Sequence, residues 1–152
     1  MLQLASLSDR ERVNDLARQV HKLHVQWRPD IFTMPAELYS EERILDAIHS
    51  RNLYVAKIGD AVIGYALLRQ RVCEGQPGLM KRRIMFIEEI CVEENLRGQG
   101  FGKEMVTDIH ALARAFRCTD LQLGVYPQND AAVGFWQKCG FTIRSIEMQK
   151  KA

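Results

Sequence analysis

Residues 88–104, EEICVEENLRGQGFGKE, limit the possible folds of this chain more than any other stretch. The stretch starts with the apolar, strand-like run 90–92 and passes through a polar turn into glycines, after which a long helical pattern begins. Its glycines are Gly98, Gly100 and Gly102. Backbone without Cβ atoms approaches a ligand closely, and the first N–H groups of a helix point at an anion with the positive end of the helix dipole behind them. The stretch therefore predicts a phosphate site between a strand and a helix.

Two common phosphate motifs do not fit the spacing of these glycines. A dinucleotide-binding G-x-G-x-x-G needs glycine at Lys103, and a P-loop needs glycine at Arg97 and Ser or Thr at Glu104. The pattern R-x-x-G-x-G, formed by Arg97, Gly100 and Gly102, does fit. It resembles the pyrophosphate loop of the GNAT superfamily of acyl-CoA N-acyltransferases. Taken alone, the glycines are also compatible with a flexible turn.

A second stretch strengthens the resemblance. Residues 129–141 are similar to the superfamily signature N-x-x-A-x-x-[FL]-Y-x-x-x-G-F, in the expected order after the first motif. The positions that agree are Asn129, Ala132, Phe135, Gly140 and Phe141. The sequence departs from the signature at Trp136, which stands where the family has tyrosine. The resemblance is strong over residues 84–141 and covers the earlier part of the chain only in outline.

Composition agrees with one ordinary domain over residues 1–152. Hydrophobic residues make up 47% and charged residues 26%, and a net charge of +2 is too small to indicate a nucleic-acid partner. The four cysteines form no C-x-x-C pair, which favours reduced thiols in the cytoplasm. We see no signal peptide and no apolar run long enough for a membrane, so we expect a cytoplasmic protein without a membrane partner. A homodimer stays open at this stage.

The apolar spacing predicts alternating helices and strands. Expected strands are residues 2–7, 53–58, 62–70, 84–92, 121–125 and 141–148. One helix is expected after a capping box at Ser8 and Glu11, a second from Ser40, a third over residues 101–116 and a fourth over residues 129–138. Gly59-Asp60 is expected to turn a hairpin, and residues 71–83 to form a loop. The resemblance implies the α/β GNAT fold, a mixed central sheet with helices on both faces.

The resemblance also implies where a cofactor binds. In the family, acyl-CoA lies in a V-shaped opening between two strands, which correspond here to residues 84–92 and 121–125. Backbone groups at the end of the first strand pair with the pantetheine arm, and the N–H groups that follow hold the pyrophosphate. The expected cofactor-binding residues are Ile90, Cys91, Val92, Arg97, Gly98, Gln99, Gly100, Phe101, Gly102, Lys103, Asn129, Ala132, Phe135 and Trp136. The implied donor is acetyl-CoA, and no metal is implied.

The implied reaction is direct attack of a primary amine on the thioester. An alkylammonium has a pKa of about 10.4 and must lose a proton before it attacks, so a base is needed. Many family members have a carboxylate or histidine at the position that corresponds to Glu88, four residues before Val92. Regular strand alternation would place Glu88, Ile90 and Val92 on one face and Glu89 and Cys91 on the other. Glu88 is our first candidate for the base, and Glu89 is the reserve.

Two further roles follow from the resemblance. The family tyrosine protonates the departing thiolate, but Trp136 has no O–H group, so either water or Tyr126 takes that role. The break between the first two helices corresponds to the acceptor wall of the family. The expected acceptor contacts are Trp27, Arg28, Asp30, Phe32 and Tyr39.

Other interpretations stay open. Glu88 could instead bind a cationic substrate or pair with Arg82 or Arg83. His21 and His24 resemble a metal pair without a third ligand, and a covalent acyl-enzyme on Cys91 lacks a histidine to activate the thiol. The missing tyrosine favours one rival in particular, a non-catalytic acyl-CoA sensor. A nucleotide-dependent enzyme is disfavoured by the glycine spacing.

Overall fold

The computed structural model describes residues 1–152, which form a five-stranded sheet in the order β1-β2-β3-β4-β5. The strands are β1 (Leu2–Leu4), β2 (Leu53–Ile58), β3 (Ala61–Cys73), β4 (Arg82–Val92) and β5 (Asp120–Leu123). The helices are α1 (Arg10–Trp27), α2 (Glu41–His49), α3 (Phe101–Ala115) and α4 (Asp130–Lys138), with short 3-10 turns at Leu7–Asp9 and Glu94–Leu96. The first four strands are antiparallel neighbours, whereas β5 is parallel to β4. No helix has both the length and the apolar character that a membrane crossing needs.

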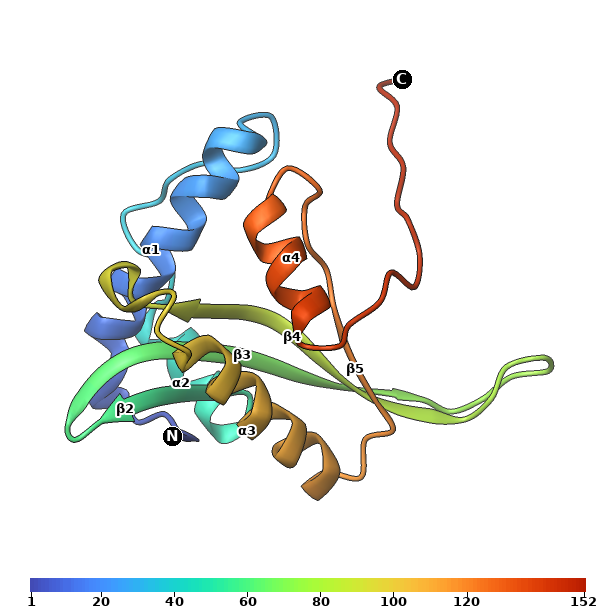
Figure 1. The fold of residues 1–152 in the computed structure, drawn as a ribbon, viewed down its shortest axis with the longest axis horizontal. Helices are drawn as coiled ribbons and strands as arrows, with labels where there is room; N and C mark the ends of the chain where they lie inside the picture. Colours follow the sequence, from blue (N-terminus) through green and yellow to red (C-terminus); the bar gives the residue numbers. More distant parts are fainter.

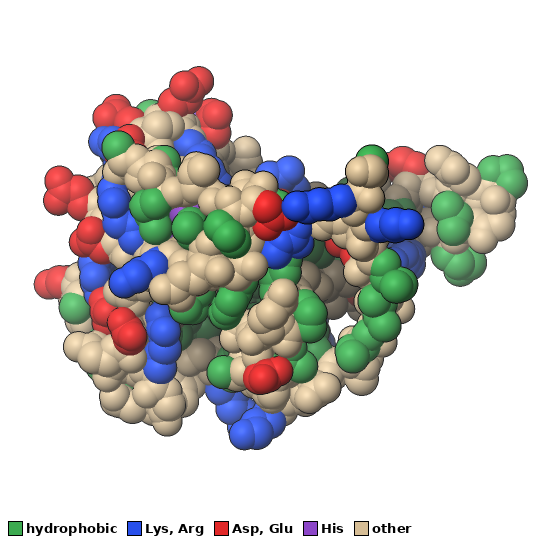
Figure 2. Space-filling view, turned by 90° about the horizontal axis from the view of Figure 1, so that it is seen from above, with side chains coloured by type: hydrophobic (Ala, Val, Ile, Leu, Met, Phe, Trp, Pro, Cys, Tyr) green, Lys and Arg blue, Asp and Glu red, His purple; other side chains and the backbone are tan.

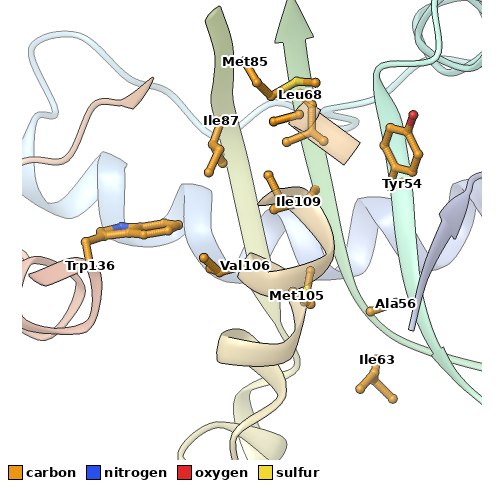
Figure 3. Packing of buried hydrophobic residues seen from close by; sticks show 12 residues of the cluster. Tyr54, Ala56, Ile63, Leu68, Met85, Ile87, Met105, Val106, Ile109 and Trp136 are labelled. Carbon is orange, nitrogen blue, oxygen red and sulfur yellow. The ribbon is translucent and has the colours of Figure 1, made fainter. Parts of the chain in front are cut away.

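Helices cover both faces of the sheet, as Figure 1 shows. One hydrophobic core joins α1 and α2 to the sheet through buried residues such as Leu16 and Ile44. The other joins α3 and α4 to the opposite face, where Trp136 points toward Val106 and Ile87 (Figure 3). The predicted mixed sheet with helices on both faces is confirmed.

The prediction of a last strand over residues 141–148 is wrong for the single chain. After α4 the chain is extended but unpaired, and it leads away from α4 and β5 to the C-terminus (Figure 1). Its apolar side chains are largely exposed, with Ile143 at 75%, Ile146 at 79% and Met148 at 94%. A strand forms only against a neighbour that pairs its backbone groups, and this segment has none within its own chain.

Two smaller expectations also change. The cap before α1 is formed by Ser6, whose N–H and hydroxyl both donate to Asp9 Oδ2 at 2.9 Å, and not by Ser8 and Glu11. The predicted loop 71–83 is shorter than expected and covers residues 74–81, because β3 and β4 stay paired as far as Cys73 and Arg82. This long hairpin projects from the body, and Figure 2 shows it on the right as a separate lobe with hydrophobic side chains at its outer end.

The β4 strand contains one extra residue next to β3. Leu67 pairs with Glu89 and Leu68 pairs with Ile87, so Glu88 forms a β-bulge. On the other side of β4, the ladder with β5 ends at Ile87 and Leu123, although β4 continues to Val92. The bulge and the end of this ladder therefore coincide in the middle of the sheet.

A glycine on β3 controls how closely this part of the sheet packs. A Cβ atom at Gly64 would lie 2.5 Å from the carbonyl oxygen of Cys91 and 3.1 Å from Met105 Sδ. We predict that Gly64→Ala lowers the free energy of unfolding by about 1–3 kcal/mol, because backbone has to move. Urea unfolding measures this change. The control is Gly134→Ala in α4, where no atom lies within 4 Å and the helix should gain about 0.5–1 kcal/mol. Equal stability of the two variants would contradict the steric argument.

Candidate active site

The site lies where β4 and β5 separate. Beyond Ile87 and Leu123 the two strands no longer pair, so the backbone of residues 88–92 has β3 as a neighbour on only one side. Residues 124–126 leave the sheet toward α1, where Tyr126 meets His24. Unpaired backbone on the inner side of β4 is available to pair with an extended ligand.

The bulge places both carboxylates of β4 on the same face of the sheet. Ile87 and Ile90 both contact the core under α3. In a regular strand, residues three positions apart face opposite sides of the sheet, so these two could not share one core. Glu89 and Cys91 face the α1 and α2 side. Glu88 bonds to Arg69, which shares its face of β3 with Leu67 in the α1–α2 core. The predicted alternation, with Glu88 and Glu89 on opposite faces, is therefore wrong.

Glu89 is fixed by two buried tyrosines. The hydroxyls of Tyr39 and Tyr65 each donate to Glu89 Oε2 at 2.7 Å. Arg43 lies 3.7 Å from Glu89 Oε1 and stacks 4.1 Å from the centre of the Tyr39 ring. Burial, together with the neighbouring charge of Glu89, raises the pKa of both tyrosines well above the usual value. Both hydroxyls therefore stay protonated and act as donors.

Tyr39 is held in place from α1. The Asn14 side chain accepts from the Tyr39 N–H at 2.8 Å and donates to the Tyr39 carbonyl at 2.9 Å. Both residues are buried, so these bonds satisfy polar groups that water does not reach. Tyr39 was predicted to contact the acceptor. The structure places it behind Glu89, where it is buried and not part of an open surface.

Glu88 has a different environment. Its oxygens lie 3.0 Å and 3.3 Å from two nitrogens of the Arg69 guanidinium, and the Arg69 side chain is 60% exposed. The alternative pairing of Glu88 with Arg82 or Arg83 does not occur, because the bulge and the hairpin register bring Arg69 into reach instead. The arginine can leave the carboxylate at little cost, since exposed ion pairs contribute about 0–1 kcal/mol.

An aromatic wall stands beside these carboxylates. His24 lies 5.9 Å from Trp27, 5.3 Å from Phe32 and 5.8 Å from Tyr126, measured between ring centres. Partial burial and the charge of His21 lower the pKa of His24, against the opposing effect of Glu89, so its imidazole is neutral at pH 7. Two of the expected acceptor contacts, Trp27 and Phe32, thus lie around His24 together with Tyr126, the expected alternative proton donor.

Arg28 and Asp30 form an exposed pair at the end of this wall. The guanidinium donates two hydrogen bonds to the carboxylate, at 2.9 Å and 2.8 Å, and holds the pKa of Asp30 at about 2. Arg28 also donates to Gln149 of the C-terminal segment at 2.9 Å. The charges of Arg28 and Asp30 therefore compensate each other.

The glycine loop has the geometry of an anion cradle. Gly98 and Gly100 have positive φ angles of 78° and 96°, which side chains disfavour, and Gly100 is the residue that caps α3. No atom lies within 4 Å of a Cβ built on either residue, so the space before them is open. The third glycine, Gly102, is needed for packing, because its Cβ would lie 3.3 Å from the Phe135 ring. The first N–H groups of α3, at residues 101–103, have no partners within the helix.

Arg97 supports the loop from behind. Its Nε donates to the Val92 carbonyl at 3.0 Å, and its guanidinium reaches Gln19 Oε1 at 3.3 Å. Gln19 in turn donates to Glu93 at 2.8 Å, and Glu93 forms an ion pair with Arg12. Two residues of α1 therefore tie the end of β4 to the loop that follows it.

The second motif stabilises α4. The Asn129 side chain caps the helix by accepting from the Ala132 N–H at 3.1 Å. Trp136 is 7% exposed and packs edge-on against Phe135 and Phe141, at 5.1 Å in each case. The indole that replaces the family tyrosine is therefore part of the core under β5.

Two earlier alternatives lose support. Burial raises the pKa of the Cys91 thiol to about 11, and its S–H donates to the Leu16 carbonyl at 3.4 Å, so it is not a ready nucleophile. No three His, Cys, Asp or Glu side chains gather as a metal site, although His21 and His24 lie 6.4 Å apart.

Sequence reasoning missed several residues of this site. These residues are Asn14, Gln19, Tyr65, Arg69 and Glu93. Tyr65 and Arg69 follow from the pairing of β3 with β4, but the bulge shifts that register and no local pattern announces it. Gln19 and Glu93 are 74 positions apart, so only the folded chain shows their contact.

Comparisons with known proteins agree with this geometry. The model of the acetyltransferase (GNAT) family matches residues 17–141. An uncharacterized N-acetyltransferase of Bacillus subtilis, YvbK, is 28% identical over 109 residues, which are 71% of this chain and 64% of that protein. The match thus spans less than two thirds of that relative.

Solved structures share the fold. A tetramutant of the BH1408 protein from Bacillus halodurans has a TM-score of 0.94 and 24% identity, over 100% of this chain and 99% of that one. The aminoglycoside N-acetyltransferase AAC(6')-Iy, in complex with CoA, has a TM-score of 0.66 and 15% identity over the full length of both chains. At these identities the likeness concerns the fold alone.

The two carboxylates should differ in their effect on stability. Glu89→Ala leaves two buried tyrosine hydroxyls without an acceptor, so we predict a loss of about 2–4 kcal/mol in the free energy of unfolding. Glu88→Ala removes only a contact with an exposed arginine and should cost less than about 1 kcal/mol. Urea unfolding of both variants tests the difference. Equal losses would mean that the tyrosine bonds do not stabilise the fold.

Proposed function

The chain belongs to the acetyltransferase (GNAT) family, and from this premise we propose that it transfers an acetyl group from acetyl-CoA to a primary amine by direct attack. The observation that supports this most is the position of the bulge. It sets Glu88 and Glu89 beside the point where β4 and β5 separate, between the glycine loop and the aromatic wall. We propose residues 1–152 as one domain with this activity.

Acetyl-CoA binds along the unpaired side of β4. Backbone groups of Ile90 and Val92 pair with the pantetheine arm, and the open N–H groups of residues 98–103 hold the pyrophosphate. Gln99 and Lys103 are the side chains at this cradle. Arg97 contributes mainly by fixing the loop, since its Nε already donates to the Val92 carbonyl. The CoA present in the AAC(6')-Iy structure is consistent with this donor.

Glu88 takes the proton from the acceptor amine. The neutral amine attacks the acetyl carbon, the C–S bond breaks, and the thiolate of CoA leaves while the attacking nitrogen releases its second proton to water and the amide forms. Both oxygens of Glu89 have close polar neighbours, two tyrosine hydroxyls and Arg43, whereas Glu88 only has to release one exposed arginine. This difference favours Glu88 over Glu89 as the base.

The thiolate leaves without a phenol from α4. Trp136 has no acidic proton and is buried in the core, so its role is to support α4 and β5. Tyr126 lies in the aromatic wall, three residues after the end of β5, and is the candidate replacement as a proton donor. With a thiol pKa of about 8.5, water also suffices for this step.

The glycine loop gives a direct test of cofactor binding. Gly100→Val puts a side chain where the pyrophosphate must approach, and we predict that the Kd for acetyl-CoA rises at least about tenfold, or about 1.4 kcal/mol. Calorimetry measures it. The matched control is Gly78→Val in the distant hairpin, where φ is also positive (85°) and no atom lies within 4 Å. Unchanged affinity in Gly100→Val would remove the loop from the cofactor site.

The proposed base has its own test. Glu88→Gln should lower kcat/KM by about 10²–10⁴-fold, the usual contribution of a positioned proton acceptor. Arg69→Gln is the control, because it breaks the same ion pair but keeps the carboxylate, and should stay within about tenfold of the parent. Steady-state kinetics of CoA release with a panel of amines provides the measurement.

The kinetic result also decides between alternatives. An active Glu88→Gln together with an inactive Glu89→Gln would move the base to Glu89. Tight CoA binding without turnover of any amine by the parent protein would favour the sensor function instead.

A further inference from the structure

The base of the β3–β4 hairpin holds an arginine that has no part in the steps described so far. Arg71 lies two residues after Arg69, the partner of Glu88, and on the same face of β3. We propose that Arg71 binds an acid group of the acceptor, so that the preferred acceptors are amines with a carboxylate or phosphate a few bonds from the nitrogen. This inference rests on the proposed function, with the acceptor amine at Glu88.

Arg71 is fixed on the sheet but has no acidic partner. Its guanidinium carbon lies 3.7 Å from the centre of the Phe86 ring. Stacking on an aromatic face leaves the N–H groups at the edge of a guanidinium free to bind a carboxylate or phosphate through two hydrogen bonds. The acidic groups around the base of the hairpin have other partners, since Glu74 pairs with Lys81 at 3.4 Å and Asp120 with Arg82 at 3.9 Å. The guanidinium of Arg71 is therefore an open anion site.

This guanidinium lies close enough to Glu88 for one small molecule to reach both groups. Phe86, on which Arg71 stacks, precedes Glu88 by two residues, about 7 Å along the strand. Phe86 is also the register partner of Arg69, which bonds to Glu88. With hydrogen bonds of about 3 Å at each end, only a short linker fits between the amine and the acid group of the acceptor.

The charges around the two carboxylates also favour an acidic acceptor. The guanidiniums of Arg43, Arg69 and Arg71 outnumber the carboxylates of Glu88 and Glu89 by one. A second positive charge is left uncompensated when Glu88 takes the proton from the amine. The aromatic wall supplies no counter-charge, because its histidine is neutral and its ion pair is balanced. An amine with an acid group brings the missing negative charge, whereas a simple alkylammonium adds to the surplus.

The alternative is a structural role, in which the Arg71 side chain only covers Phe86. Phe86 is half-buried and belongs to neither hydrophobic core, so it does gain contact from the arginine. A cover of this kind needs the methylene groups of the side chain and not its charge. The two roles therefore differ in one measurable respect: only the acid site makes the choice of acceptor depend on the charge of Arg71.

Matched pairs of amines test the acid site. The pairs are β-alanine with propylamine and 4-aminobutyrate with butylamine, which differ in the carboxylate but little in the basicity of the amine. The parent protein should have a kcat/KM at least about tenfold higher for the acid member of a pair. Arg71→Gln, a change of an exposed residue, should remove this preference by lowering kcat/KM for the acid member alone. The control is Arg83→Gln on the opposite face of the hairpin, where Arg83 donates to the Phe116 carbonyl at 3.3 Å, and it should keep the preference.

Binding measured without turnover separates this inference from the proposed function. In calorimetry with CoA present, the acid member should bind the parent at least about tenfold more tightly than its partner, but not Arg71→Gln. A parent that acetylates no amine would contradict the proposed transfer, whereas this difference in Kd would still support the acid site. Equal Kd values within each pair would overturn the acid site, and so would a preference that Arg71→Gln retains. Tighter binding of 3-aminopropylphosphonate than of 4-aminobutyrate would support the site and identify its ligand as a phosphate.

Discussion

Opposite Leu67 and Leu68 of β3, the neighbouring strand β4 contains one residue more than a regular ladder accommodates. This extra residue, Glu88, changes the direction of the strand at the place where the pairing with β5 stops. Three features of the site depend on it: both carboxylates face α1, the inner side of β4 stays unpaired, and Glu89 reaches the tyrosines. Without the bulge, Glu88 would point into the core under α3.

Helix α1 connects the parts of the site that the sheet alone does not fix. Along its length, Asn14 holds Tyr39 behind Glu89, Gln19 holds the glycine loop through Arg97 and Glu93, and His24 belongs to the aromatic wall. These contacts explain how one helix couples the positions of the cofactor loop and the acceptor wall. A shift of α1 would change both at once, because α1 contacts all three groups.

The replacement of the family tyrosine by Trp136 has a structural explanation. The ring fills the space between α3, α4 and β5 and packs between Phe135 and Phe141. The larger indole makes more apolar contact in this core than a phenol would. The proton donor function is thereby left to Tyr126 or water in the proposed mechanism, and the same ring fixes the start of the C-terminal segment.

The features that depend on local residue types could be predicted from the sequence. The glycines at 98, 100 and 102 fixed the strand, turn and helix around them, because their backbone angles and close packing exclude side chains. The two motifs identified the family, and apolar spacing located all four helices and the first five strands within a few residues. The cap at Ser6 and the length of the β3–β4 hairpin lay outside what these local patterns specify.

The remaining features of the site depend on contacts between distant parts of the chain. The bulge at Glu88, the partners of both glutamates and the ties of α1 depend on strand register and on residues far apart in the chain. The apolar pattern of residues 141–148 predicts a strand, and the structure has none there. Whether it becomes one depends on a neighbour, because a strand, unlike a helix, finds its hydrogen-bond partners outside its own segment.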